Sequence, residues 1–255
     1  VYSNSFEFFK RTYLSSAMNK ILNSIVDVLS SRGGRNVYPL YSLYGGGKTH
    51  TLITIYHAIK TPKALEIVSR DLAIKFMEIA DKVRLVVLDC DSEKLVPSPL
   101  SPLKVEMYSV HTIWGALAHQ LGRYDDLRIE DERGVVPTVD RLRGLLGKRP
   151  TVILIDEVVK YASRFEKSSS REMRDYSRAI IVFIENLAKA VSDTNTVLVI
   201  TLPIKVRKVG ETVQIELFEE PYASMSKACF RAIGRVTSTY DIPLTTCLLY
   251  TSDAA

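Results

Sequence analysis

The sequence contains no apolar run approaching the roughly 18 to 20 residues that a helix needs to cross a bilayer. Its N-terminus also lacks the basic and apolar regions of a signal peptide. Internal repeats and low-complexity tracts are absent as well, so the chain is not a repeat array. These absences predict a cytoplasmic protein with no membrane partner.

Cysteine and histidine are both scarce. The three cysteines, Cys90, Cys229 and Cys247, are far apart and have no C-x-x-C spacing. This odd and scattered set supports neither a disulfide framework nor a zinc site. Of the four histidines, His50 and His57 fall on one predicted helix, where packing is favoured over metal binding.

Neither sign of charge dominates, because 34 Lys and Arg stand against 29 Asp and Glu, for a net charge of +5. This surplus permits contact with DNA without showing it. Residues 164–178 are mixed in sign and predict a solvated helix face. The basic run 205–208 lies in an alternating segment, 204–217, that predicts a two-stranded hairpin and is the better candidate for phosphate contact.

What the sequence does contain is a run of three glycines, Gly45, Gly46 and Gly47, followed by Lys48 and Thr49. The run connects the apolar segment 37–41 to the helical stretch 49–60. Its backbone N–H groups can therefore turn towards a polyphosphate at a helix N-terminus, as in a P-loop. Lys48 is predicted to reach the β- and γ-phosphates of ATP, and Thr49 to ligate Mg²⁺.

The predicted nucleotide-binding residues are Gly45, Gly46, Gly47, Lys48, Thr49 and His50. The usual P-loop pattern, G-x-x-x-x-G-K-[S/T], begins with glycine, whereas this chain has Ser42 at that position.

A second motif follows the β-branched run 151–155, which ends in Asp156 and Glu157. Such a run predicts a buried parallel strand that carries acids at its C-terminal end, and it resembles a Walker B strand. Asp156 is predicted to hold Mg²⁺, and Glu157 to orient or deprotonate the attacking water. Alternatively, the two acids merely end a core strand in a surface turn.

Along the chain between these motifs lies a further apolar run, 83–88, which ends in Asp89. An additional strand together with Glu157 resembles the additional-strand catalytic-glutamate division of P-loop ATPases, which includes the AAA+ proteins. A later strand, 196–200, ends at Thr201. The resemblance implies that Thr201 is a catalytic sensor 1 residue contacting the γ-phosphate or the attacking water, although it equally fits an ordinary strand end.

The alternation of strands and helices predicts an α/β fold, a P-loop NTPase with a mainly parallel sheet in three αβα layers. Thr61 and Pro62 predict the N-cap and first residue of the helix that follows the P-loop helix. The predicted parts are an N-terminal helical segment, 1–36, and an ATPase core, 37–246, with an insertion at about 91–137. Apolar spacing further predicts helices within 18–29, 65–79, 112–122 and 173–191.

The last residues, 247–255, resemble the translation of a transposase-type sequencing adapter and are expected to carry no evolved structure or function. The chain would then stop before the helical lid, with its sensor 2 arginine, that usually follows an AAA+ core. Arg231 and Arg235 lie in an amphipathic segment. Either is a candidate arginine finger, which would act between subunits of a homo-oligomer.

Several segments together resemble one prokaryotic family of large AAA+-like ATPases, known mostly as a domain of unknown function. Its members are often encoded beside adenine-specific DNA methylases and helicases, in clusters that look like restriction or antiviral defence systems. The resemblance implies the ATPase subunit of a DNA-modification or defence complex, with DNA and a methylase or helicase as partners. The segments that carry it are 9–14, 45–52 with Tyr56 and His57, 112–115, Asp156 with Glu157, and 199–203.

Three functions remain open from the sequence. An ATP-hydrolysing switch or motor is favoured by Glu157 and the additional strand. A P-loop phosphotransferase would need an acceptor pocket in the insertion at about 91–137. A scaffold that binds ATP without hydrolysing it is favoured by Ser42, which departs from the usual P-loop pattern.

Overall fold

The computed structural model describes residues 3–42, 47–209, 212–218 and 220–236. Four parallel strands of these residues form the central sheet, and the sequence predicted each of them. In spatial order they are β1 (Val37–Tyr41), β6 (Thr196–Leu202), β5 (Thr151–Asp156) and β2 (Arg84–Asp89).

The two inner strands of the sheet, β5 and β6, are buried along their whole length. Both are nearly continuous runs of β-branched and other apolar residues, as expected for parallel strands covered on both faces. The strand β2, at 84–89, lies between the two motifs in the sequence but not in the sheet, where it is the outer neighbour of β5. The strand that separates β1 from β5 is β6.

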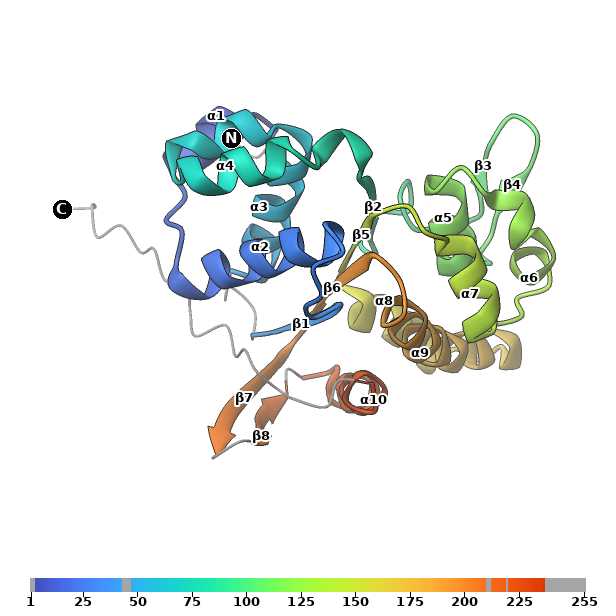
Figure 1. Cartoon of the computed structure of the whole chain (residues 1–255). Coiled ribbons are helices and arrows are strands. Elements are labelled where there is room, and N and C mark those ends of the chain that lie inside the picture. Colours follow the sequence, from blue (N-terminus) through green and yellow to red (C-terminus); the bar gives the residue numbers. More distant parts are fainter. Residues whose placement is uncertain (1–2, 43–46, 210–211, 219, 237–255) are drawn as a thin grey trace.

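Helices cover both faces of the sheet and form one hydrophobic core on each side. This arrangement is compatible with the predicted three-layer αβα architecture (Figure 1). One core contains side chains of α1 (Ser5–Lys10), α2 (Ser16–Leu29), α3 (Lys48–Lys60), η1 (Pro62–Ile67) and α4 (Arg70–Met77). The other contains side chains of α5 (Ile113–Gln120), η3 (Tyr124–Asp126), α7 (Val139–Leu146), α8 (Val158–Glu166), α9 (Arg171–Val191) and α10 (Ala223–Gly234).

Short elements complete the described chain. A 3₁₀ turn, η2 (Ala80–Lys82), leads into β2, and α6 (Arg128–Glu132) follows η3 in the insertion. Two antiparallel hairpins are formed by β3 (Leu103–Lys104) with β4 (Ser109–Val110), and by β7 (Ile204–Val209) with β8 (Thr212–Phe218). The second hairpin is the one predicted at 204–217, and it projects away from the sheet (Figure 1).

Thr61 and Pro62 occupy the predicted N-cap and first helical positions, but the helix that they start is not the expected α-helix. Pro62 starts a short 3₁₀ helix, and the Thr61 side chain caps nothing there. The backbone N–H groups of Val68 and Ser69 both donate to the carbonyl of Leu65, which closes this first segment. The α-helix α4 begins only afterwards, because the Ser69 hydroxyl accepts from the N–H of Leu72 and supplies the cap.

Other predicted helices are present, with boundaries close to those expected. The helix in the insertion, α5, is capped by Thr112 and followed by Gly122 at φ 67°, the left-handed backbone that favours glycine. The long apolar stripe at 173–191 is α9, which Ser170 caps. Among the described residues, no helix is both long and apolar enough to span a membrane.

Candidate functional site at the carboxyl edge of the sheet

Three polar side chains lie side by side where neighbouring parallel strands end. Asp156 ends β5, and Asp89 is its register partner at the end of β2. Thr201 of β6 lies one position beyond the Ile155–Ile200 pair. Because side chains alternate between the faces of a strand, and Leu154 and Val199 belong to the core beneath α3, these polar residues point to the α3 side of the sheet.

Asp156 connects these strands to the start of α3. Its Oδ2 accepts a hydrogen bond of 2.9 Å from the Thr49 hydroxyl, and its Oδ1 accepts one of 2.5 Å from the Thr201 hydroxyl. The backbone N–H of Glu157 donates to the same Oδ1 at 3.1 Å. The carboxylate is about nine-tenths buried. The sequence predicted Thr49, Asp156 and Thr201 separately, and the fold brings them together.

The last residue of the glycine run allows the chain to turn sharply into α3. Gly47 has φ 78°, in the left-handed region that favours glycine, and its carbonyl accepts the first helical hydrogen bond from Thr51. Gly45 and Gly46 lie outside the described residues. Lys48 is buried, and its Nζ donates to the carbonyl of Ser42 at 2.6 Å. Its ammonium group is thereby held near the carboxyl end of β1.

Glu157 has an unusual backbone at the junction of β5 and α8. Its φ is 55°, left-handed for a non-glycine residue, and its N–H also reaches the Thr201 hydroxyl at 3.3 Å. Backbone of this kind is costly and is often found at functional sites. Burial, and then the negative charge of Asp156, raise the pKa of the Glu157 carboxyl above its ordinary value, while Lys48 lowers it.

The imidazole of His50 is in contact with the N-terminal segment. Its ring lies 4.7 Å from that of Phe8, between centroids, and its Nε2 is 3.3 Å from the Thr12 hydroxyl. Partial burial lowers the pKa of His50. The ring of His57 also contacts Phe8, at 5.1 Å, so both histidines pack against α1. Nucleotide contact by His50 stays a prediction.

A cavity of about 200 Å³ opens beside Thr49 and Asp156. Asp89, for which the sequence predicted only a strand-end position, is the other acid in its wall. The strand-end position of Asp89 was visible in the sequence, but its place next to Asp156 depends on the order of strands in the sheet. The remaining lining residues are Leu52, Ile53, Tyr56, Val87 and Leu154.

The sequence profile of the DUF499 N-terminal domain matches residues 1–241. The chain belongs to this family. The matched part of this DUF499 chain includes the glycine run, both strand-end acids, Thr201 and the insertion. A search of curated proteins found no match.

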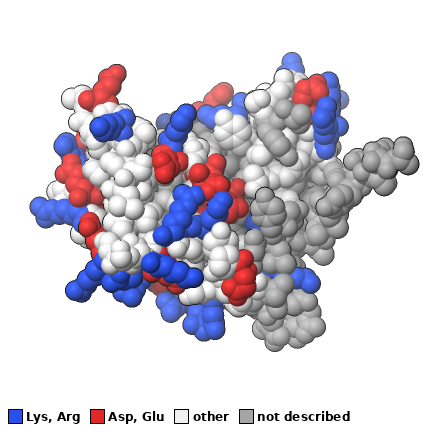
Figure 2. All heavy atoms as spheres, turned by 180° about the vertical axis from the view of Figure 1, so that it is seen from behind, with Lys and Arg blue, Asp and Glu red and all other residues white. Residues whose placement is uncertain are grey.

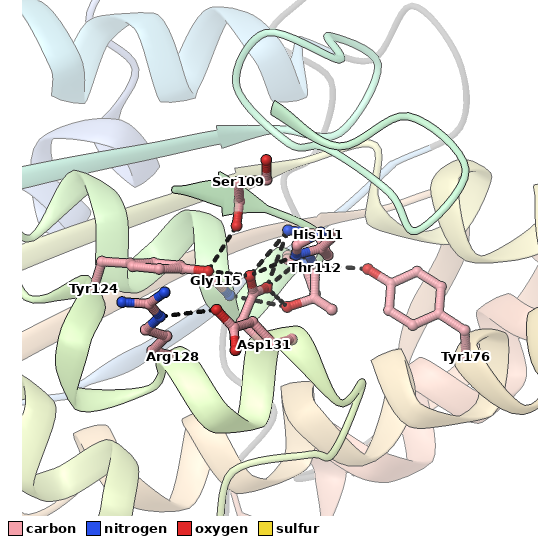
Figure 3. Close-up of polar contacts among 10 residues, drawn as sticks. Ser109, His111, Thr112, Gly115, Tyr124, Arg128, Asp131 and Tyr176 are labelled. Atoms are coloured by element: carbon pink, nitrogen blue, oxygen red, sulfur yellow. Dashed lines mark hydrogen bonds and ion pairs between the residues drawn. The ribbon is translucent and has the colours of Figure 1, made fainter. Parts of the chain in front are cut away.

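The insertion of the DUF499 domain has a separate polar cluster around Asp131 (Figure 3). The Asp131 carboxylate is buried and accepts from the backbone N–H groups of His111 and Thr112 at 3.0 and 2.8 Å. It also accepts from the hydroxyls of Thr112 and Tyr124 at 2.5 and 2.8 Å. A Cβ added at Gly115 would lie 2.0 Å from Asp131 Oδ1, so the contact requires glycine. Asp131 therefore holds the start of α5 in place.

A second cavity, of about 880 Å³, lies beside this cluster. None of the described P-loop or Walker B residues lines it. Tyr176 of α9 lines this cavity, and its hydroxyl lies 2.8 Å from that of Tyr161 on α8. The cavity is lined by Pro99, His111, Thr112, Asp131, Glu132, Arg133, Gly134, Arg171, Glu172, Met173, Asp175, Tyr176 and Ala179.

The two candidate arginine fingers differ in their surroundings. Arg235 follows α10 and forms an ion pair with Glu185 of α9 at 2.9 Å, so it helps to fix α10 on its own chain. Arg231 is exposed on α10. Action of either arginine between subunits stays a prediction.

Charged side chains of both signs are interspersed on the face of the DUF499 domain seen in Figure 2. In the part of α9 that lies within the segment predicted as a solvated face, Arg171 and Arg178 are exposed and flank Asp175 at 3.6 and 3.2 Å. Cys90 and Cys229 are buried, and burial raises the pKa of both thiols, to about 12 for Cys229. Cys247 lies outside the described residues.

Proposed function

We propose that this DUF499 domain binds Mg·ATP at the carboxyl edge of its parallel sheet and hydrolyses it. The observation that carries the proposal is the convergence on Asp156, which accepts hydrogen bonds from Thr49 and Thr201. Thr49 and Asp156 are 107 positions apart. If Asp156 only ended a core strand in a surface turn, nothing would require it to contact the first turn of α3, the helix that follows the glycine run.

The residues at this edge fit both Mg²⁺ and the polyphosphate of ATP. The Thr49 hydroxyl and the Asp156 carboxylate offer the hard oxygen ligands that Mg²⁺ prefers. The N-terminus of α3 favours a polyphosphate because its first backbone N–H groups lack intrahelical acceptors and the helix dipole is positive there. Lys48, in the same turn, adds a positive charge. The glycine φ at Gly47 allows the backbone to approach such a ligand closely.

The bound Mg·ATP supplies the γ-phosphoryl group that water attacks. Lys48 neutralises phosphate charge, and Asp156 with Thr49 holds the metal. Thr201 fixes the Asp156 carboxylate by donating to it. Glu157, with its raised pKa, is a stronger base than an ordinary glutamate and orients or deprotonates the attacking water.

The order of the strands supports hydrolysis over the alternative functions. The run at 83–88, expected to be the additional strand, forms β2 on the outer side of β5; the strand between β1 and β5 is β6, and it delivers Thr201 to Asp156. A phosphotransferase would need an acceptor pocket open to the γ-phosphate. The large cavity of the insertion shares no lining residue with the described part of the ATP site, and therefore does not favour that function. The scaffold function differs only in turnover, which the experiment below measures.

The resemblance stated above extends the proposal to partners. We propose that the domain is the ATPase of a cytoplasmic DNA-modification or defence complex that contains a DNA methylase or helicase. The projecting β7–β8 hairpin is the proposed DNA contact, and a homo-oligomer is the proposed assembly.

The deciding experiment is titration of the chain with a fluorescent ATP analogue in the presence of Mg²⁺, compared with Lys48→Ala. We expect Lys48→Ala to bind about 10- to 100-fold more weakly, since a hydrogen bond to a charged group contributes about 1.5–3 kcal/mol. Lys60→Ala, at the exposed far end of the same helix, is the matched control and should bind normally. Equal affinity of Lys48→Ala and the unaltered chain would refute the site.

Turnover is tested with Glu157→Gln. This variant should bind Mg·ATP normally while hydrolysis falls by about 10²- to 10⁴-fold, the range for loss of a general base. Binding without turnover in the unaltered chain would instead support the scaffold function.

A further inference from the structure

Asp89 lies where a magnesium site would be completed. It ends β2 and is paired in register with Asp156 across the parallel strands β2 and β5. Since Thr201 is delivered by β6, on the other side of β5, Asp156 has a polar neighbour on each side. Residues in register on adjacent parallel strands point to the same face, and both acids line the cavity of about 200 Å³ together with Thr49.

The oxygens of Asp156 are already engaged. Oδ2 accepts from Thr49, while Oδ1 accepts from Thr201 and from the N–H of Glu157. Mg²⁺ gives up its water reluctantly and usually keeps several water ligands in an octahedral arrangement. These waters need hydrogen-bond acceptors, which Asp156 alone can supply only in part.

Asp89 differs from the other acid of the same turn. Its Oδ1 accepts a hydrogen bond of 3.1 Å from the backbone N–H of Asp91, which orients the carboxyl group within the turn. Asp91 itself forms ion pairs with Lys160 at 2.9 Å and with Arg164. These cations lower the pKa of Asp91, through the Lys160 hydrogen bond first. The carboxylate of Asp91 is therefore committed to α8, while Asp89 lines the cavity.

We propose that Asp89 is a positioning residue for Mg²⁺, which accepts hydrogen bonds from the water ligands of the metal on the side of Asp156 opposite Thr201. The inference rests on the proposed function, because it assigns a further residue to the same site. It explains why a polar residue ends β2 in the wall of a cavity whose lining is otherwise largely apolar.

The test is Asp89→Asn compared with Asp91→Asn, measured as binding of the fluorescent ATP analogue over a range of free Mg²⁺. An asparagine at 89 keeps an oxygen that accepts from the N–H of Asp91, so the turn is preserved while the charge is removed. We expect Asp89→Asn to need about 10- to 100-fold more Mg²⁺ for half-maximal binding, as is typical when a partner of a metal's ligands is lost. Asp91→Asn should need the same Mg²⁺ as the unaltered chain.

Binding of the analogue without Mg²⁺, in a chelator, should be equal in all three proteins, which separates loss of the metal from damage to the phosphate-binding loop. Equal Mg²⁺ requirements of Asp89→Asn and the unaltered chain would overturn the role of Asp89 while leaving the ATP site intact. Absence of any binding by the unaltered chain, with and without Mg²⁺, would overturn the proposed function and this inference together. Thermal melting of each variant checks that it is folded.

Discussion

Two hydroxyl groups donate to different oxygens of Asp156, and they have different expected roles. Thr49 was predicted as a metal ligand, so its hydrogen bond is one that a bound metal would replace. Thr201 lies on a buried strand, where its hydroxyl has little alternative to Asp156. The sensor 1 role suggested by the sequence, contact with phosphate or water, stays a prediction. The structure adds the orientation of Asp156 as a separate role for Thr201.

Replacement of Thr201 by Val, which keeps the shape and removes the hydroxyl, should destabilise the fold. A hydrogen bond to a charged group contributes about 1.5–3 kcal/mol, and loss of this one leaves Oδ1 with only the N–H of Glu157. The measurement is urea unfolding. Thr196→Val on the same strand is the matched control, because the buried Thr196 hydroxyl has no hydrogen-bond partner among the described residues. Equal losses in the two variants would show that β6 merely disfavours valine at its threonine positions.

Glu157 provides a prediction about pH. Its pKa is raised from 4.5, chiefly by burial, so at neutral pH its charge destabilises the folded state relative to the unfolded one. Glu157→Gln should therefore raise the melting temperature at pH 7. The difference in melting temperature should shrink as the pH falls through the raised pKa, since Glu157 then becomes neutral in the folded protein, as glutamine is at every pH.

The raised pKa should also appear in kcat/KM, which reports ionisation in the free enzyme. A general base works only when deprotonated, so hydrolysis should decline on acidification at a pH above the ordinary glutamate value. The checks are the pH–rate profile of the unaltered chain, and the melting temperatures of the unaltered chain and of Glu157→Gln from pH 4 to pH 8. A difference in melting temperature between Glu157→Gln and the unaltered chain that is constant over this range would contradict the assignment.

At the scale of elements, the sequence predicted where the strands are in the chain better than which strands lie next to each other in the sheet. Apolar runs that end in Asp89, Asp156 and Thr201 indicated strands because local pattern is enough to define a buried strand. Their order in the sheet depends on contacts between distant segments. The same limit applies to the capping of helices: the Ser69 cap was missed because a capping residue is defined by the backbone that follows it.

The insertion shows this limit most clearly. The stretch from Thr112 to Gly115 carried part of the family resemblance, and the sequence predicted a short helix there. Its polar partner, Asp131, is 19 positions from Thr112 in a charged segment that carried no distinguishing signal. Only the folded chain places the carboxylate over the start of α5, where Gly115 leaves room for it (Figure 3).

Gly115→Ala should therefore destabilise the domain by about 1–3 kcal/mol, the usual cost of overpacking a buried site. The added Cβ would displace a carboxylate that is held by several hydrogen bonds and cannot swing away freely. The control is Gly144→Ala in α7, where a Cβ meets nothing within 4 Å and the helix should gain about 0.5–1 kcal/mol. Chemical denaturation measures both. Equal effects of the two substitutions would mean that the Asp131 cluster rearranges around the added Cβ without a loss of stability.

For the molecule as a whole, the proposed ATP site lies at the carboxyl edge of the sheet, whose two faces are each covered by one hydrophobic core. The helix α3 belongs to the core on one face, and β5 and β6 contribute to both cores. The α/β class followed from the alternation of strands and helices. The convergence of Thr49, Asp156 and Thr201 did not, because it requires β6 to lie between β1 and β5.

A ligand bound at this edge would add contacts between α3 and the sheet that the unfolded chain cannot make, so it should stabilise the whole domain. At about 100 times its dissociation constant, Mg·ATP contributes about 2.7 kcal/mol. A domain of this size gains roughly 2–4 °C in melting temperature per kcal/mol, and the predicted shift is therefore about 5–10 °C. Thermal melting of Glu157→Gln with and without Mg·ATP measures this shift without loss of ligand by hydrolysis. Lys48→Ala, with its roughly 10- to 100-fold weaker binding, should gain only about 0.4–1.4 kcal/mol at the same ligand concentration, about half of that shift or less, and Thr196→Val should shift fully. Shifts of equal size in Lys48→Ala and Glu157→Gln would mean that the nucleotide stabilises the chain from somewhere other than the edge where Asp156 and Thr49 meet.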